Sequence, residues 1–174
     1  MNKIQTHWDN ICKIYFLTKH YLLLSEELSE DFDTFLQPLK EHRDAFDHIA
    51  RVYGYDMLDK KVDDVEKYRE ENMNKAVGHT YRAFFDTADW LSYICRKKIR
   101  DLLSQYTREQ ILNKYEKYEE VKIILNRIPK EIAQIRKSKD LSDDETVLIE
   151  EVDQYSIVLD QLLEIYNEVY AIFA

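Results

Sequence analysis

Glycine and proline are scarce in this 174-residue sequence, which contains only two of each. Sheets and long loops need residues that suit turns, so this scarcity favours long helices joined by short connections. No uncharged apolar run reaches the roughly 18 residues that a membrane-spanning helix needs. The charged residues Asp9 and Lys13 interrupt the N-terminal sequence, which therefore lacks the continuous apolar centre of a signal peptide. We therefore expect a cytoplasmic helical protein with no membrane contact.

Cysteine is also rare, and the two that occur, Cys12 and Cys95, form no C-x-x-C pattern. Such a pair is typical of reduced thiols in the cytoplasm and argues against a structural zinc site. The paired Glu-x-x-His elements of a di-iron helical bundle are missing from the sequence as well. We expect neither a metal nor another cofactor.

Basic residues are missing from the end of the chain. From Asp140 to Ala174 there are ten acidic residues and no Lys or Arg, whereas the other 24 of the 34 acidic residues are balanced by 25 basic ones. The net charge of −9 therefore belongs to the last segment, and the balanced remainder leaves room for a local basic site. One basic cluster is interpreted as a contact to nucleic-acid phosphates, although it also suits a solvated helix face: Arg96, Lys97 and Arg100.

Apolar residues recur at intervals of three and four, which predicts amphipathic helices. The first three are expected over residues 3–28, from 29 or 31 to 53, and over 59–105. In the second, Pro38 either bends the helix or starts it again, and Gly54 suits a left-handed helix end. Gly78 lies inside the third and indicates a bend or a close crossing. The second helix is expected to face the core with an apolar stripe of six residues: Phe32, Phe35, Leu39, Phe46, Ile49 and Tyr53.

Two capping-box patterns mark later helix starts. "TREQ" (Thr107–Gln110) begins a helix that Pro129 closes, a short helical piece follows, and "SDDE" (Ser142–Glu145) begins the last helix. The last helix has an apolar stripe with unbroken steps of four and three, typical of long antiparallel packing. We expect one all-α domain over residues 1–174, an up-and-down antiparallel bundle of about five to six helices with a long acidic C-terminal helix.

The stretch from Leu39 to Gly54, LKEHRDAFDHIARVYG, concentrates titratable residues in the middle of the second expected helix. Asp44 and His48 are four residues apart, so their side chains share a face, where a carboxylate can accept one imidazole N–H. Arg51 follows three residues later, and the long side chain of Arg43 can curl toward the same region.

A second polar stripe follows in the next helix, where His79, Arg82, Asp86 and Asp89 step by three and four. A short loop joins the two helices, so we expect antiparallel neighbours whose stripes face one cleft. Two other interpretations stay open. One is a salt-bridge network that fixes helix register. The other is an ion held by Asp44 with His48, or by His79 with Asp86.

The residues from Arg43 to His48, RDAFDH, resemble the R-x4-H motif of the HEPN superfamily (higher eukaryotes and prokaryotes nucleotide-binding domains). The family pattern is an Arg, four to six further residues and a His, with a polar residue directly after the Arg. Asp44 fits that position. The resemblance covers roughly residues 1–128, a HEPN-like core. Residues 129–174, a short helix and the long acidic C-terminal helix, lie outside it.

The resemblance implies a metal-independent endoribonuclease. In that mechanism His48 acts as an acid or base at the ribose 2′-OH, Arg43 stabilises charge on the phosphate, and Asp44 orients the pair. It also implies RNA as the ligand and a homodimer that builds the cleft from both copies. Other family members have lost catalysis and serve as binding modules or neutralised toxin partners. The alternative is a non-catalytic helical module for dimerisation or protein interaction, with the C-terminal helix docking the partner.

Overall fold

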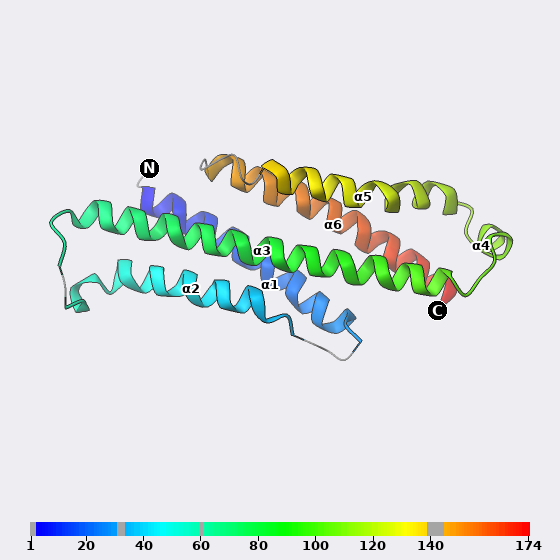
Figure 1. Ribbon diagram of the computed structural model, residues 1–174, viewed down its shortest axis with the longest axis horizontal. Coiled ribbons are helices and arrows are strands. Elements are labelled where there is room, and N and C mark those ends of the chain that lie inside the picture. Colours follow the sequence, from blue (N-terminus) through cyan, green and yellow to red (C-terminus); the bar gives the residue numbers. More distant parts are fainter. Residues whose placement is uncertain (1–2, 31–33, 60, 139–144) are drawn as a thin grey trace. The chain divides into compact units, whose positions relative to one another are not determined.

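The computed structural model describes residues 3–30, 34–59, 61–138 and 145–174, with six α-helices and one short 3-10 helix (Figure 1). Within these ranges the structure contains no β-strand. The prediction of an all-α protein is therefore confirmed. The first residues of the predicted capping box at Ser142 lie outside the described ranges.

The chain divides into two compact units, Met1–Thr87 and Ala88–Ala174. Unit 1 contains α1 (Lys3–Leu28), α2 (Leu36–Tyr53), the 3-10 helix η1 (Tyr55–Met57) and the first part of α3 (Val65–Leu103). Its buried centre includes Ile14, Tyr21, Met73 and Phe84. The bounds of α1 agree with the sequence prediction, whereas α2 and α3 both begin several residues later than predicted.

Unit 2 contains the rest of α3, together with α4 (Arg108–Lys114), α5 (Tyr118–Ser138) and α6 (Glu145–Phe173). Helix α6 runs along α5 (Figure 1). The prediction of a long C-terminal helix is confirmed. Leu148, at the start of the predicted apolar stripe, is half-buried, and the other members are buried: Val152, Tyr155, Leu159, Leu162, Tyr166, Val169 and Phe173. The prediction of a single domain over residues 1–174 stays a prediction.

The two ends of α2 show how proline and glycine act here. Helix α2 begins at Leu36, so Pro38 lies in its first turn, where a missing N–H costs little. Gly54 follows the helix with φ −97°, so the predicted left-handed end is wrong. A Cβ atom at this position would lie 2.8 Å from the carbonyl oxygen of Ala50. Glycine is required there by a close backbone approach.

The predicted core face of α2 is wrong at its large exposed residues, although Ile49 is half-buried, and Phe32 lies outside the described residues. Leu39, Phe46 and Tyr53 are 42%, 69% and 64% exposed, whereas Ala45 and Val52 are buried. The buried set precedes the exposed set by one residue, so α2 is rotated by about 100° from the expected orientation. Its packed face carries small side chains, and a stripe of large apolar residues faces outward. We call Leu39, Phe46 and Tyr53 the outer stripe of α2.

The capping box at Thr107 is confirmed. The Thr107 side chain accepts a hydrogen bond from the backbone N–H of Gln110, and the Gln110 side chain accepts one from the backbone N–H of Thr107. The helix it begins is shorter than predicted, because the backbone leaves the helical conformation at Tyr115. Helix α5 then passes through Pro129, so the predicted end there is wrong. Pro129 is exposed, where water can reach the backbone carbonyl that loses its intrahelical partner.

Gly78 lies inside α3 without a steric reason. A Cβ atom there would meet only the Nη1 atom of Arg82, at an ordinary 3.6 Å, so the predicted close crossing is wrong. Gly78→Ala is expected to raise the free energy of unfolding by about 0.5–1 kcal/mol, since alanine is the better helix former. Urea denaturation followed by circular dichroism measures this. Gly54→Ala is the opposing control and should destabilise. A loss of stability in Gly78→Ala would contradict the account.

Candidate functional site

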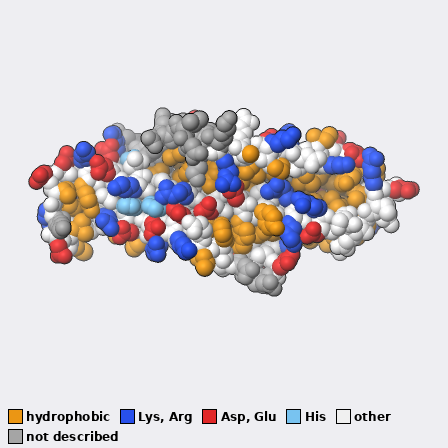
Figure 2. Space-filling model, viewed as in Figure 1, with side chains coloured by type: hydrophobic (Ala, Val, Ile, Leu, Met, Phe, Trp, Pro, Cys, Tyr) orange, Lys and Arg blue, Asp and Glu red, His pale blue; other side chains and the backbone are white. Residues whose placement is uncertain are grey.

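Helices α2 and α3 line an open surface hollow of about 500 Å³ in unit 1. In Figure 2 the pale blue histidine surface over α2 and α3 is bordered by basic and acidic side chains. The structure thus brings Arg43, Asp44 and His48 to one hollow and adds His79 from the second polar stripe. The described residues that line it are Arg43, Asp44, Phe46, Asp47, His48, Ala50 and His79.

The orientation of His48 is set by Asn72, a buried residue of α3. The Nδ1 atom of His48 lies 2.9 Å from the Oδ1 atom of Asn72, and the Asn72 Nδ2 atom donates to the carbonyl oxygen of Tyr68 at 2.8 Å. The bond to Tyr68 identifies Nδ2 as the amide donor, so the oxygen faces His48 and must accept. His48 therefore carries its proton on Nδ1 when neutral. Its Nε2 atom is then a free acceptor, as a general base requires.

His79 belongs to a charged network that joins α3 to α2. Its Nδ1 atom lies 2.8 Å from the Oε2 atom of Glu41, which also accepts from the Nε atom of Arg82 at 2.9 Å. The Arg82 Nη2 atom lies 2.6 Å from the same imidazole nitrogen. Nδ1 can donate to Glu41 or accept from Arg82, but not both at once. The position of the His79 proton is therefore tied to these two charges.

The two imidazole rings are neighbours. Their centroids lie 5.4 Å apart with the ring planes inclined by 25°, so His48 of α2 stacks beside His79 of α3. One ring can accept a proton while the other donates one, which is the minimum arrangement for general acid–base catalysis. The structure thus brings one histidine from each polar stripe, His48 and His79, to the same hollow.

Arg43 and Asp44 bind each other rather than the imidazoles. The Arg43 Nε and Nη2 atoms donate to the Oδ1 atom of Asp44 at 3.0 and 2.7 Å, and the Arg43 side chain is 74% exposed. The hydrogen bond from Arg43 lowers the pKa of the Asp44 carboxyl, and the nearby histidines act in the same direction. Asp44 thus holds the guanidinium at the hollow and leaves its Nη1 atom outside the pair.

The remaining residues of the predicted cleft lie elsewhere. Arg51 donates from Nε to the Oδ2 atom of Asp47 at 2.8 Å and is not among the described residues that line the hollow. Asp86, half-buried one turn after Arg82, is not among them either. In unit 2, Asp89 accepts from the Tyr155 hydroxyl at 2.6 Å and pairs with Arg136 at 2.7 Å.

Two residues that position the histidines, Glu41 and Asn72, were not predicted from the sequence. Each lies seven residues before one of the histidines, Glu41 before His48 and Asn72 before His79. Seven residues are two helical turns, so each shares a face with its histidine. That spacing was the available signal.

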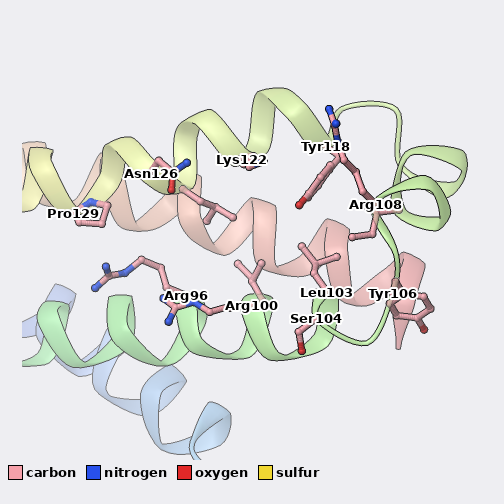
Figure 3. Close-up of a pocket in the computed structure, with 13 residues that line it drawn as sticks. Arg96, Arg100, Leu103, Ser104, Tyr106, Arg108, Tyr118, Lys122, Asn126 and Pro129 are labelled. Carbon is pink, nitrogen blue, oxygen red and sulfur yellow. The ribbon is translucent and has the colours of Figure 1, made fainter.

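Of the three predicted nucleic-acid contacts, all in unit 2, two line a pocket and the third does not. Arg96 and Arg100 line a pocket of about 480 Å³ between α3 and α5 (Figure 3), whereas Lys97 pairs with Asp101 one turn away. Among the residues described, no group of three or more His, Cys, Asp or Glu side chains is placed to hold a metal ion.

Comparisons of the chain with protein-family models, curated proteins and solved structures give no match. The resemblance to the HEPN superfamily therefore rests on the motif residues and the helical fold. In the described ranges, no helix has an apolar stretch long enough to cross a membrane.

The network around Glu41 predicts a pH-dependent stability. Burial raises the pKa of the Glu41 carboxyl, but hydrogen bonds from His79 and Arg82 outweigh burial and bring the pKa below its ordinary value of 4.5. A lowered pKa stabilises the folded state above that value, and this stabilisation is lost as the pH falls through the lowered pKa. Glu41→Gln should therefore reduce the free energy of unfolding by about 1–2 kcal/mol at pH 7.

The measurement is urea denaturation of both proteins from pH 7 to pH 3. The difference between them should shrink as the pH falls below 4.5, the ordinary pKa of the carboxyl. Glu27→Gln, at an exposed glutamate of α1, is the matched control and should match the wild type throughout. A difference that stays constant across this range would contradict the network.

Proposed function

We propose that unit 1 is a metal-independent endoribonuclease of the HEPN type, with the hollow between α2 and α3 as its cleavage site. One observation carries the proposal. The Asn72 contact leaves the Nε2 atom of His48 free to accept a proton, in a hollow that also contains a second imidazole and an exposed guanidinium.

In the proposed reaction, Nε2 of His48 removes the proton of a ribose 2′-OH. The 2′-oxygen attacks the adjacent phosphorus, and the bond from phosphorus to the 5′-oxygen of the next nucleotide breaks. His79 donates a proton to that leaving oxygen. Arg43 donates to a non-bridging oxygen while charge builds on the phosphate. The products are a 2′,3′-cyclic phosphate end and a 5′-hydroxyl end.

Size favours single-stranded RNA as the substrate. A volume of about 500 Å³ holds one nucleotide and its phosphate, but no double helix. Sequence-specific recognition of RNA usually takes place on unstacked single-stranded bases. Asp44 already accepts hydrogen bonds from the Arg43 guanidinium. A phosphate must therefore compete with Asp44 for the same donors.

We also propose that a second copy of the chain covers the outer stripe of α2. Leu39, Phe46 and Tyr53 repeat every seven residues and are all exposed, which suits packing against a matching helix. Phe46 lines the hollow as well. A partner on this stripe would border the site in both copies of a homodimer.

The outer stripe also favours a second function, that of a non-catalytic interaction module. A further place for a protein partner, such as an antitoxin, is α6, where Ile157 is 70% exposed beside a hollow of about 430 Å³ shared with α5. Nuclease activity separates the two functions. We further propose a cytoplasmic location, in keeping with the free thiols of Cys12 and Cys95.

The nuclease proposal predicts cleavage of mixed RNA in the presence of a chelator, with cyclic-phosphate ends. His48→Ala should lower the rate about 100-fold or more, the usual contribution of one acid–base group. Arg43→Ala should also cleave RNA more slowly than the wild type. Matched controls are His20→Ala, at an exposed histidine of α1, and Arg127→Ala, at an arginine of α5 that pairs with Glu131 in unit 2. Cleavage at equal rates by wild type and His48→Ala would come from a contaminant and would rule out the enzyme.

The dimer proposal predicts that Phe46→Asp sediments as a monomer, because it places a charge on the outer stripe of α2. Phe16→Asp is the matched control, since Phe16 of α1 is 66% exposed and lies outside the stripe. Analytical ultracentrifugation measures both variants and the wild type. A wild-type protein that sediments as a monomer, or a dimer that survives Phe46→Asp, would contradict the proposal.

A further inference from the structure

Unit 2 contains a basic pocket that the proposed nuclease does not use. It lies between α3 and α5, with residues of α4 at one end (Figure 3). Its volume of about 480 Å³ lies within the range of small-molecule sites. The described residues that line it are Arg96, Ile99, Arg100, Leu103, Ser104, Tyr106, Arg108, Ile111, Tyr118, Lys122, Leu125, Asn126 and Pro129.

Every charged residue in this lining set is basic, although the segment from Asp140 onward makes the chain strongly acidic. Arg96 and Arg100 lie one turn apart on α3, and α5 contributes Lys122 to the lining. The Nε atom of Arg96 donates to the carbonyl oxygen of Ser92 at 3.1 Å, which fixes the base of the guanidinium. Arg108 is partly neutralised by Glu119 at 2.7 Å. The positive potential of the pocket therefore centres on α3 and Lys122.

Apart from Ser104 and Asn126, the other lining residues are apolar or aromatic. Ile99 and Leu103 of α3 and Leu125 of α5 form its wall, and Tyr118 adds an aromatic ring. A bare inorganic anion would leave this surface in contact with water. A ligand that unites an anion with a flat apolar body would use both parts, because guanidinium groups bind phosphate oxygens in pairs and rings stack on tyrosine.

We propose that this pocket binds a nucleoside phosphate, either a free nucleotide or the terminal nucleotide of an RNA strand. Arg96, Arg100 and Lys122 bind the phosphate, and the base lies against Tyr118 and the aliphatic wall. The site is in the other unit of the chain and needs no contribution from His48. It therefore stands or falls independently of the cleavage site.

The test uses the full chain and calorimetric titration with AMP, GMP, CMP, UMP, adenosine and inorganic phosphate. At least one nucleotide, or an RNA with a 5′-phosphate, should bind about tenfold more tightly than adenosine or phosphate alone, since each of these two uses one part of the pocket. Arg100→Ala and Lys122→Ala, both at exposed positions, should each weaken that binding by about tenfold. Tyr118→Leu should weaken nucleotide binding and leave phosphate binding unchanged.

Lys97→Ala is the matched control, because Lys97 lies on the same helix but pairs with Asp101 outside the pocket. It should bind like the wild type, and so should His48→Ala. A hexanucleotide RNA with and without a 5′-phosphate, titrated into His48→Ala so that the proposed nuclease does not cleave it, separates the two sources. Binding of the free nucleotides identifies a nucleotide site, and binding of only the phosphorylated RNA identifies a strand end.

Three results would overturn the proposal. The first is the absence of binding by any nucleotide or RNA probe. The second is an equal loss of affinity in Lys97→Ala and Arg100→Ala. The third is binding of a poly-glutamate peptide at the pocket with no binding of nucleotides, which would make it a site for an acidic protein segment.

Discussion

Two polar contacts join α2 to α3 in unit 1. Glu41 binds His79 and Arg82, and His48 binds Asn72. Hydrogen bonds to charged groups contribute about 1.5–3 kcal/mol each, as much as burying one large apolar side chain. The contacts to Glu41 therefore offset part of what α2 loses by leaving Phe46 on the outside, with Ala45 in the core.

With α2 in this orientation, the residues that connect α2 to α3 also form the candidate site. A salt-bridge network that fixes helix register and a pair of catalytic imidazoles looked like alternatives in the sequence. In the structure they adjoin, since the network holds His79 and the Asn72 contact holds His48, with the rings stacked between them. The same rotation exposes the outer stripe of α2 beside the hollow, where we place the second copy of the chain.

The helical class, the bounds of α1, the capping box at Thr107 and the stripe of α6 could be predicted, because each depends on local periodicity or local hydrogen bonds. The rotation of α2 could not, because both of its faces carry residues at seven-residue spacing and only the partners on α3 decide between them. For the same reason Glu41 and Asn72 were missed. The hydrogen bond considered between Asp44 and His48 is replaced by one with another partner for each residue. Asp44 accepts from Arg43, and His48 contacts Asn72.

The central claim is that Asn72 fixes the proton of neutral His48 on Nδ1 and leaves Nε2 as the base. Nitrogen-15 NMR of the imidazole, at a pH where His48 is neutral, measures this directly. The account predicts an Nδ1–H tautomer in the wild type and a shift toward the Nε2–H tautomer in Asn72→Ala. A wild-type His48 with its proton on Nε2 would contradict the account, because that ring could not accept a proton from the 2′-OH at the exposed nitrogen.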